Sequence, residues 1–323
     1  MTSEDEKDGN AWAQAMVERV QRGAQEARQR RDELAAAVDD LADGFTKLGM
    51  KQWKSSRKSE ARRDAGASVV PLGARTETVP RILKYESAVN ILSAADQLRG
   101  FAVLLRAEAS LMGAVSVSRG VFEACLWATA VIDPTITTEE RLQRAFARRL
   151  ARLSAAVRLK DLLGDNVTDA DQVDEVDDDE DEHGTNRDPA EDIDEIVTYA
   201  KAQGWFVTKG RRAYEINKPL TIDWLVENLE RRIGVEGYAW TSGSSMAHGE
   251  HPADTASWIE LSQDIGTAPA WLIRIWSTGA WAGPRLFLAT LAEYTGKVSL
   301  AREYKRFNDA FWDVGVRNGE ASS

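Results

Sequence analysis

Residues 12–48 read WAQAMVERVQRGAQEARQRRDELAAAVDDLADGFTKL, and the spacing of apolar side chains in this stretch decides the fold class. Alternating steps of four and three residues place these side chains on one face of a helix, as in a coiled-coil seam. A helix of this length spans about 55 Å, so it needs another long helix beside it, within the chain or in a second copy. The seam positions are Val20, Ala24, Ala27, Arg31, Leu34, Val38, Leu41, Phe45 and Leu48.

A second stripe of the same kind begins after Pro80 and supplies the candidate partner helix. Its small residues would allow another helix to approach closely. Further helical patterns cover 189–203, 222–233 and 268–294, with Thr221 as the cap of the second of these. The sequence therefore predicts an all-α helical bundle with a long N-terminal helix. The second stripe consists of Ala88, Ile91, Ala95, Leu98, Ala102, Leu105, Ala109 and Met112.

The chain divides into six expected segments. Gly66, Pro71 and Gly73 favour a loop in the basic to small-residue linker, and one small β-hairpin is expected around the turn at Lys209 to Arg211. The segments are the long helix 1–54, the linker 55–78, a first helical core part 79–164, an acidic insert 165–188, a second helical core part 189–317 and a disordered tail 318–323.

The acidic insert dominates the net charge. Sixteen acidic side chains and one arginine lie between Asp165 and Glu195, so this stretch carries −15 while the whole chain carries −11. Its few apolar side chains cannot offset the entropy lost on ordering, so residues 165–188 are expected to be disordered. Two roles stay open, a solubilising linker and an anionic segment that folds over nearby arginines.

Those arginines lie on a helix that Thr138 is expected to cap. Arg144, Arg148 and Arg152 recur at intervals of four residues and form a positive ridge. Such a ridge could bind the phosphates of RNA. Trp240 is a further candidate, either for lining a cleft beside His248 or for filling the core.

The stretch WTSGSSMAHGEHPAD, residues 240–254, contains two of the three histidines. Their spacing matches no zinc motif, so neither a metal nor another cofactor is expected. On a helix, Ser245 and His248 would share a face, where they could perform acid–base chemistry or only satisfy each other. Arg119 and Glu123 form a similar pair, either a structural salt bridge or a pair that faces a cleft.

Three motifs carry a resemblance to a known group. They are the pair Arg119 and Glu123, the arginine-rich helix that starts near Glu139, Glu140 and Arg141, and the pattern of Tyr238, Ser242, His248 and Gly249. Together they resemble actinobacterial all-helical proteins of unknown function, which are similar to HEPN-type domains, over Ala88 to Leu291. The resemblance implies an RNase with Arg119 and His248 in its site. The arginine that HEPN nucleases carry four to six residues before the histidine is missing, because the nearest one is Arg232.

Two functions follow as hypotheses. The first is a helical interaction or regulatory protein, in stress response or phage defence, that assembles through its coiled-coil helix into a homo-oligomer or with a protein partner. The alternative is a HEPN-like RNase that uses Arg119 and His248. The acidic N-terminus and the lack of a long uncharged apolar run favour a cytoplasmic protein outside the membrane. Cys125, the single cysteine, is expected to pack in the core.

Overall fold

The computed structural model describes residues 3–51, 53–67, 69–107, 111–163, 188–210, 213–217, 221–229 and 270–297, with a few further positions up to 309. Within these residues the protein is the all-α bundle that the sequence predicts, with two small antiparallel β-hairpins where one was expected. Residues 165–187 of the acidic insert and the tail 318–323 lie outside the described residues.

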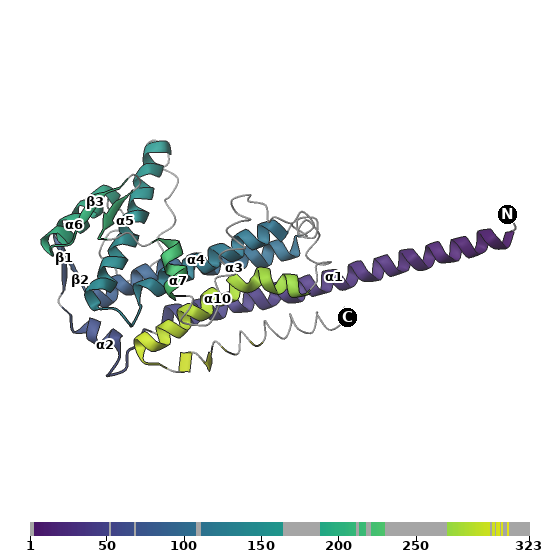
Figure 1. Cartoon of the computed structure of the whole chain (residues 1–323), viewed down its shortest axis with the longest axis horizontal. Coiled ribbons are helices and arrows are strands. Elements are labelled where there is room, and N and C mark those ends of the chain that lie inside the picture. The colour runs from purple at the N-terminus through teal and green to yellow at the C-terminus, as the bar shows by residue number, and fades with distance from the viewer. Residues whose placement is uncertain are drawn as a thin grey trace, which may run out of the picture.

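Four long helices form the body of the molecule (Figure 1). They are α1 (Ser3–Lys51), α3 (Val79–Arg106), α4 (Leu111–Val131) and α10 (Ala270–Thr295). Helix α3 runs opposite to α1, since Arg99 bonds to Asp43 whereas Arg106, later on α3, bonds to the earlier Asp39 at 2.6 Å. Helix α10 runs parallel to α1, because Phe45 contacts Phe287, and Trp53, just beyond the end of α1, contacts Tyr294 farther along α10. The bundle therefore mixes parallel and antiparallel neighbours.

The seam predicted from residues 12–48 packs on α3 of the same chain along its second half. Leu34 is 6% exposed and Leu48 is 4% exposed, while Val38 and Phe45 are fully buried. The surface ion pair between Arg99 of α3 and Asp43 of α1, at 3.1 Å, belongs to the same antiparallel contact. The second stripe therefore supplies the partner helix, and the buried members of that stripe are Ile91, Ala95, Leu98, Ala102 and Leu105.

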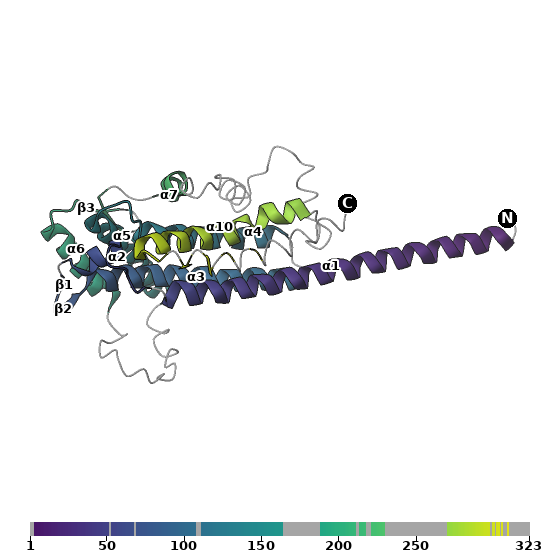
Figure 2. The same ribbon diagram turned by 90° about the horizontal axis from the view of Figure 1, so that it is seen from below.

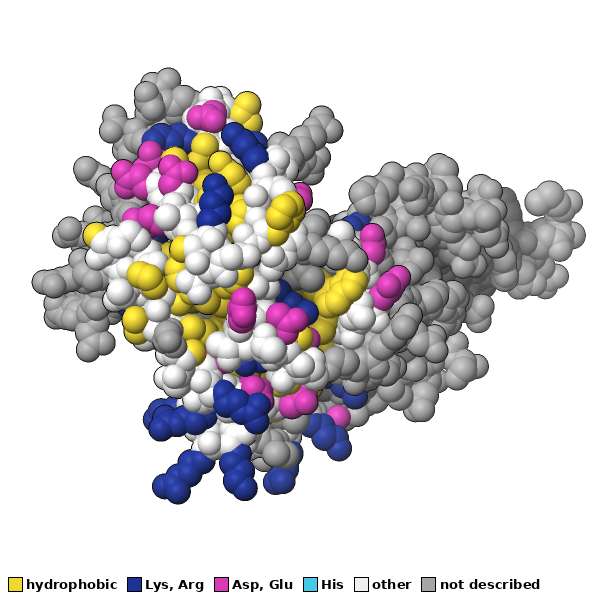
Figure 3. Space-filling model, turned by 60° about the vertical axis from the view of Figure 1, so that its left-hand side comes forward, with side chains coloured by type: hydrophobic (Ala, Val, Ile, Leu, Met, Phe, Trp, Pro, Cys, Tyr) yellow, Lys and Arg dark blue, Asp and Glu magenta, His cyan; other side chains and the backbone are white. Residues whose placement is uncertain are grey.

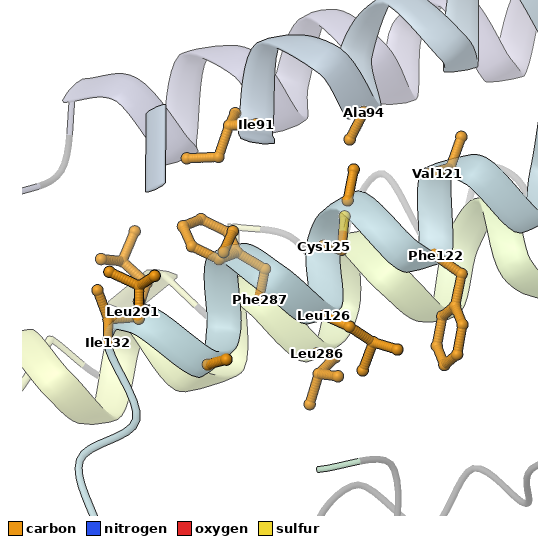
Figure 4. Packing of buried hydrophobic residues seen from close by; sticks show 14 of the residues in the cluster. Ile91, Ala94, Val121, Phe122, Cys125, Leu126, Ile132, Leu286, Phe287 and Leu291 are labelled. Carbon is orange, nitrogen blue, oxygen red and sulfur yellow. The ribbon is translucent and has the colours of Figure 1, made fainter. Parts of the chain in front are cut away.

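The centre of the core lies where α4 and α10 meet α1 and α3 (Figure 4). The ring of Phe287 meets that of Phe45 edge to face, with ring centroids 5.9 Å apart. Helix α10 contains Pro284, which lacks an amide hydrogen for the helix ladder. One turn earlier, the amide of Ala280 donates a hydrogen bond of 2.9 Å to the Ser118 hydroxyl of α4. A polar bond thus ties α10 to α4 next to the proline.

Cys125 packs in this core with 1% exposure, which confirms the prediction from sequence. Burial raises the pKa of its thiol well above the usual value, so little reactive thiolate forms. We expect iodoacetamide to label the native protein on the order of a thousandfold more slowly than the urea-unfolded protein at the same pH. Mass spectrometry reads the rate directly because the chain has one cysteine. Similar rates in both states would contradict a closed contact between α4 and α10.

Residues 55–78, expected to be a linker, contain regular structure. Helix α2 (Glu60–Ala65) begins at the N-cap Ser59, and strands β1 (Val70–Leu72) and β2 (Arg75–Glu77) form a hairpin. Gly73 adopts a φ of 58° in the turn, a conformation that glycine accepts without strain. Gly73 therefore marks a tight turn rather than a loop, and buried Val70 and Leu72 attach the hairpin to the core.

Helix α5 (Thr138–Leu163) leaves the bundle at an angle and packs against α6 (Pro189–Ala202) (Figure 1). Strands β3 (Val207–Lys209) and β4 (Tyr214–Ile216) pair antiparallel, which confirms the predicted hairpin. Helix α7 (Ile222–Leu229) starts at its predicted cap, since the hydroxyl of Thr221 accepts a hydrogen bond from the amide of Trp224 at 3.2 Å. Helix α6 lies on the Phe146 side of α5, whereas Trp224 of α7 contacts the arginine-bearing face.

Among the described helices, α3 alone has the length and apolar composition of a membrane span. The core helix of a bundle shows the same properties, and α3 is sandwiched between α1 and α4. A lipid-facing role for α3 would require those contacts to open.

Candidate functional site

Helix α5 begins with a capping box. The hydroxyl of Thr137 accepts a hydrogen bond from the amide of Glu140 at 3.1 Å, and the Glu140 carboxylate accepts one from the amide of Thr137 at 2.9 Å. The bonds from the Thr137 amide and hydroxyl lower the pKa of Glu140. The predicted cap, Thr138, was therefore wrong by one residue, because its hydroxyl donates to the carboxylate of Asp64 instead.

Two of the three predicted binding arginines on α5 are paired with carboxylates. Nη1 of Arg144 lies 3.5 Å from the carboxylate of Asp133, and the guanidinium lies 5.3 Å from the centre of the Trp224 ring. Arg152 binds the carboxylate of Glu86 through two hydrogen bonds, of 2.7 and 2.9 Å. These guanidinium groups contact α3, α4 and α7, so the ridge faces neighbouring helices.

The third, Arg148, is held in a different way. Its Nη2 donates to the side-chain oxygen of Asn90 at 3.0 Å, and the guanidinium lies 4.2 Å from the ring centre of Trp127. Burial lowers the pKa of Arg148 to about 10; the charge of Glu86 opposes the decrease and that of Arg152 adds to it. The side chain therefore remains a cation at neutral pH, but in a site that solvates its charge less well than water does.

Arg119 and Glu123 form the salt bridge expected from their spacing on α4. Nε of Arg119 lies 2.6 Å from the carboxylate, with the two side chains 14% and 31% exposed. The remaining site candidates, His248, Ser245 and Trp240, lie outside the described residues. A meeting of Arg119 and His248, which the RNase hypothesis requires, therefore stays a prediction.

Sequence reasoning missed a buried polar cluster at the base of α5. Asp64 of α2 accepts hydrogen bonds of 2.9 and 2.7 Å from the Arg141 guanidinium and one of 2.8 Å from the Tyr294 hydroxyl. Burial alone would lower the pKa of Arg141, but the bonds and charge of Asp64 raise it. Burial, then the charge of Asp64, raises the pKa of Tyr294. The cluster joins α2, α5 and α10, and Thr138 completes it.

Basic side chains gather on the surface around α2. In Figure 3, Lys and Arg side chains crowd the lower edge of the face shown, on the side of the molecule where α2 lies in Figure 1. Among residues 51–63, Glu60 is the single acidic side chain, and it pairs with arginines. The surface around α2 is therefore a local concentration of positive charge. The exposed basic residues here are Lys51, Lys54, Arg57, Lys58, Arg62 and Arg63.

In the described ranges, no group of three or more His, Cys, Asp or Glu side chains could hold a metal ion. The arginine-bearing face of α5 offers guanidinium groups, aromatic rings and one amide. Such a set can bind and orient an anion.

Comparison with known proteins gives no match to a family model, to a curated protein or to a solved structure. The resemblance to actinobacterial helical proteins and to HEPN-type domains therefore rests on its motifs alone.

Proposed function

We propose that this protein is an interaction protein that forms homo-oligomers through the first half of α1. The observation that carries the proposal is the extension of α1 well beyond the ends of α3, α4 and α10 in two perpendicular views (Figures 1 and 2). A helix of 49 residues is about 70 Å long, so the bundle accompanies only part of it. The remaining part presents a long helical surface to a partner.

The heptad seam continues into this extension. Val17 occupies the position three residues before Val20, in step with the seam, and is 54% exposed. Farther along the same seam, Leu34 is 6% exposed and Val38 is fully buried against α3. One seam thus serves two parts of the helix, and its apolar character outside the bundle supports helix pairing there.

Helix propensity also favours a partner for the extension. Gly9 and Gly23 each disfavour a helix by about 1 kcal/mol relative to alanine. Most of the stability of a helix in a protein comes from the packing of its apolar face rather than from helix propensity. Burial of the seam against a second helix would supply that packing and offset the effect of the two glycines.

The charge distribution favours a second, antiparallel copy as the partner. Residues 3–10 contain four acidic side chains and one lysine, whereas residues 19–31 contain five arginines and one glutamate. An antiparallel pair places the acidic end of each helix beside the basic half of the other. A parallel pair would instead align like charges, which is unfavourable.

The test is the molar mass of the full chain in solution. We expect light scattering after size exclusion to give a dimer for the wild type and a monomer for Val17→Glu/Val20→Glu. The two glutamates would place charges in the seam and remove the apolar contact between the helices. Thermal unfolding of the bundle should change little. The matched control, Gln25→Glu/Gln29→Glu, adds the same charge away from the seam and should remain dimeric. A monomeric wild type at micromolar concentration would overturn the proposal.

Disulfide formation separates the two orientations. In an antiparallel pair centred near residue 18, Val17→Cys should cross-link under mild oxidation, while Ala27→Cys should not, since the two copies of residue 27 would lie far apart. Cross-linking of both variants would indicate a parallel pair instead. The native Cys125 is buried and does not compete.

A further inference from the structure

The arginines of α5 differ in how their charge is compensated. Four of them lie within 4.0 Å of a carboxylate in the described part of the chain, whereas Arg148 forms no ion pair there. An unpaired cation that is largely removed from water is costly unless an anion accompanies it. The paired arginines are Arg141 with Asp64, Arg144 with Asp133, Arg149 with Glu77 and Arg152 with Glu86.

Two neighbours hold Arg148 in place without neutralising it. Asn90, which is 5% exposed, donates to the backbone carbonyl of Glu86 at 2.7 Å and thereby turns its side-chain oxygen toward Arg148. The face of Trp127 supports the other side of the guanidinium. An aromatic ring and a neutral amide orient the group but leave its charge available.

Most donors of this oriented guanidinium remain unused. Arginine has five N–H groups, and among the described residues Arg148 donates one hydrogen bond, from Nη2. The side chain is partly exposed to solvent. We infer that Arg148 is the centre of a phosphate-binding site at the junction of α3, α4 and α5.

The surrounding charges suit an anion of one or two charges. Arg144 and Arg152 lie one helical turn to either side of Arg148, and the carboxylates of Glu86 and Glu123 face it from α3 and α4. Glu86 and Glu123 are themselves bonded to Arg152 and Arg119, respectively. Tetrahedral phosphate oxygens can accept several of the free N–H groups at once. Inorganic phosphate, a nucleotide and the RNA backbone share this chemistry.

The experiment titrates the full chain with inorganic phosphate at low salt and follows heat by calorimetry. We expect saturable binding with one site per chain in the wild type. Arg148→Met keeps an apolar stem over Trp127 but removes the charge, and it should weaken binding at least about tenfold. The control Arg99→Met removes a half-exposed surface arginine of α3, and it should bind phosphate as the wild type does. Wild-type heats that stay at the level of dilution up to about 10 mM phosphate would overturn the inference.

A second variant guards against a folding defect. Asn90→Asp keeps the size of the side chain and gives Arg148 a carboxylate partner, so it should remove phosphate binding. It also loses the donor to the Glu86 carbonyl, so circular dichroism and thermal unfolding first establish that the variant is folded at the temperature of the titration. Phosphate binding that persists in both variants would place the site elsewhere and contradict the inference.

Two further ligands identify the source of the phosphate group. Adenosine monophosphate and a short single-stranded RNA are titrated into the wild type, Arg148→Met and Asn90→Asp. Arg148-dependent binding of the nucleotide alone would assign a small-molecule ligand. Arg148-dependent binding of the RNA, weakened by salt, would assign the nucleic-acid backbone. Either result supports an oxyanion site at Arg148.

Discussion

Replacement of Asp64 by alanine is expected to lower the free energy of unfolding by about 3–5 kcal/mol. Asp64 and Arg141 are both fully buried, and the carboxylate is the counter-ion of the guanidinium. The substitution leaves a buried charge without its partner, and the hydroxyl groups of Tyr294 and Thr138 lose their acceptor. Urea unfolding followed by circular dichroism measures the loss.

Two further variants make that measurement specific. Asp43→Ala removes a surface partner of Arg99, and it should cost less than about 1 kcal/mol, because solvent screens that pair. The double variant Asp64→Leu/Arg141→Met replaces the buried pair with apolar groups and should regain much of the stability lost in Asp64→Ala. A double variant that is less stable than Asp64→Ala would show that the ion pair contributes more to the free energy of unfolding than the neutralisation of its own two charges.

Gly283→Ala is expected to destabilise the fold by about 1–3 kcal/mol, although alanine is the better helix former. A Cβ atom at this position would lie 3.0 Å from the Cα of Phe122 and 3.0 Å from the Cβ of Cys125. These atoms belong to or adjoin the backbone of α4, so the two helices would have to separate. Thermal unfolding should show a lower midpoint, and Cys125 should label faster in native buffer.

Gly100→Ala is the matched control on α3. A Cβ atom there would meet its nearest neighbour, Cγ1 of Val117, at 4.0 Å, which is an ordinary contact. The substitution should therefore raise the free energy of unfolding by about 0.5–1 kcal/mol through helix propensity alone. A destabilised Gly100→Ala, or a neutral Gly283→Ala, would contradict the helix spacing described for the bundle.

The fold class was predictable from sequence because apolar periodicity reports burial directly. The seam from Leu34 to Leu48 and the stripe from Ile91 to Leu105 each pointed to a long partner helix, and they meet each other. The hairpin at 207–216 also followed from its turn. Residues 55–78 were misjudged, because Pro71 and Gly73 are typical of both a linker and a tight hairpin, and periodicity is uninformative in strands of three residues.

The site was less predictable because its contacts join residues that are distant in sequence. The spacing of Arg144, Arg148 and Arg152 placed them on one face, but it gave no partners, and Glu86 and Asn90 lie about sixty residues earlier. The sequence alone does not distinguish Arg141 from the other arginines of α5. The sequence separations in that cluster are 77 and 230 residues, which no local pattern reveals.

The parallel placement of α10 against α4 has a consequence for how the protein is made. Phe122 and Cys125 of α4 rest on residues around Gly283, more than 150 positions later in the chain. Tyr294 must likewise be translated before Asp64 gains its last hydrogen bond. As the chain emerges from the ribosome, the apolar face of α4 stays uncovered while these residues are synthesised, a state that invites aggregation or chaperone binding. The bundle closes late in translation, after α10 has left the exit tunnel.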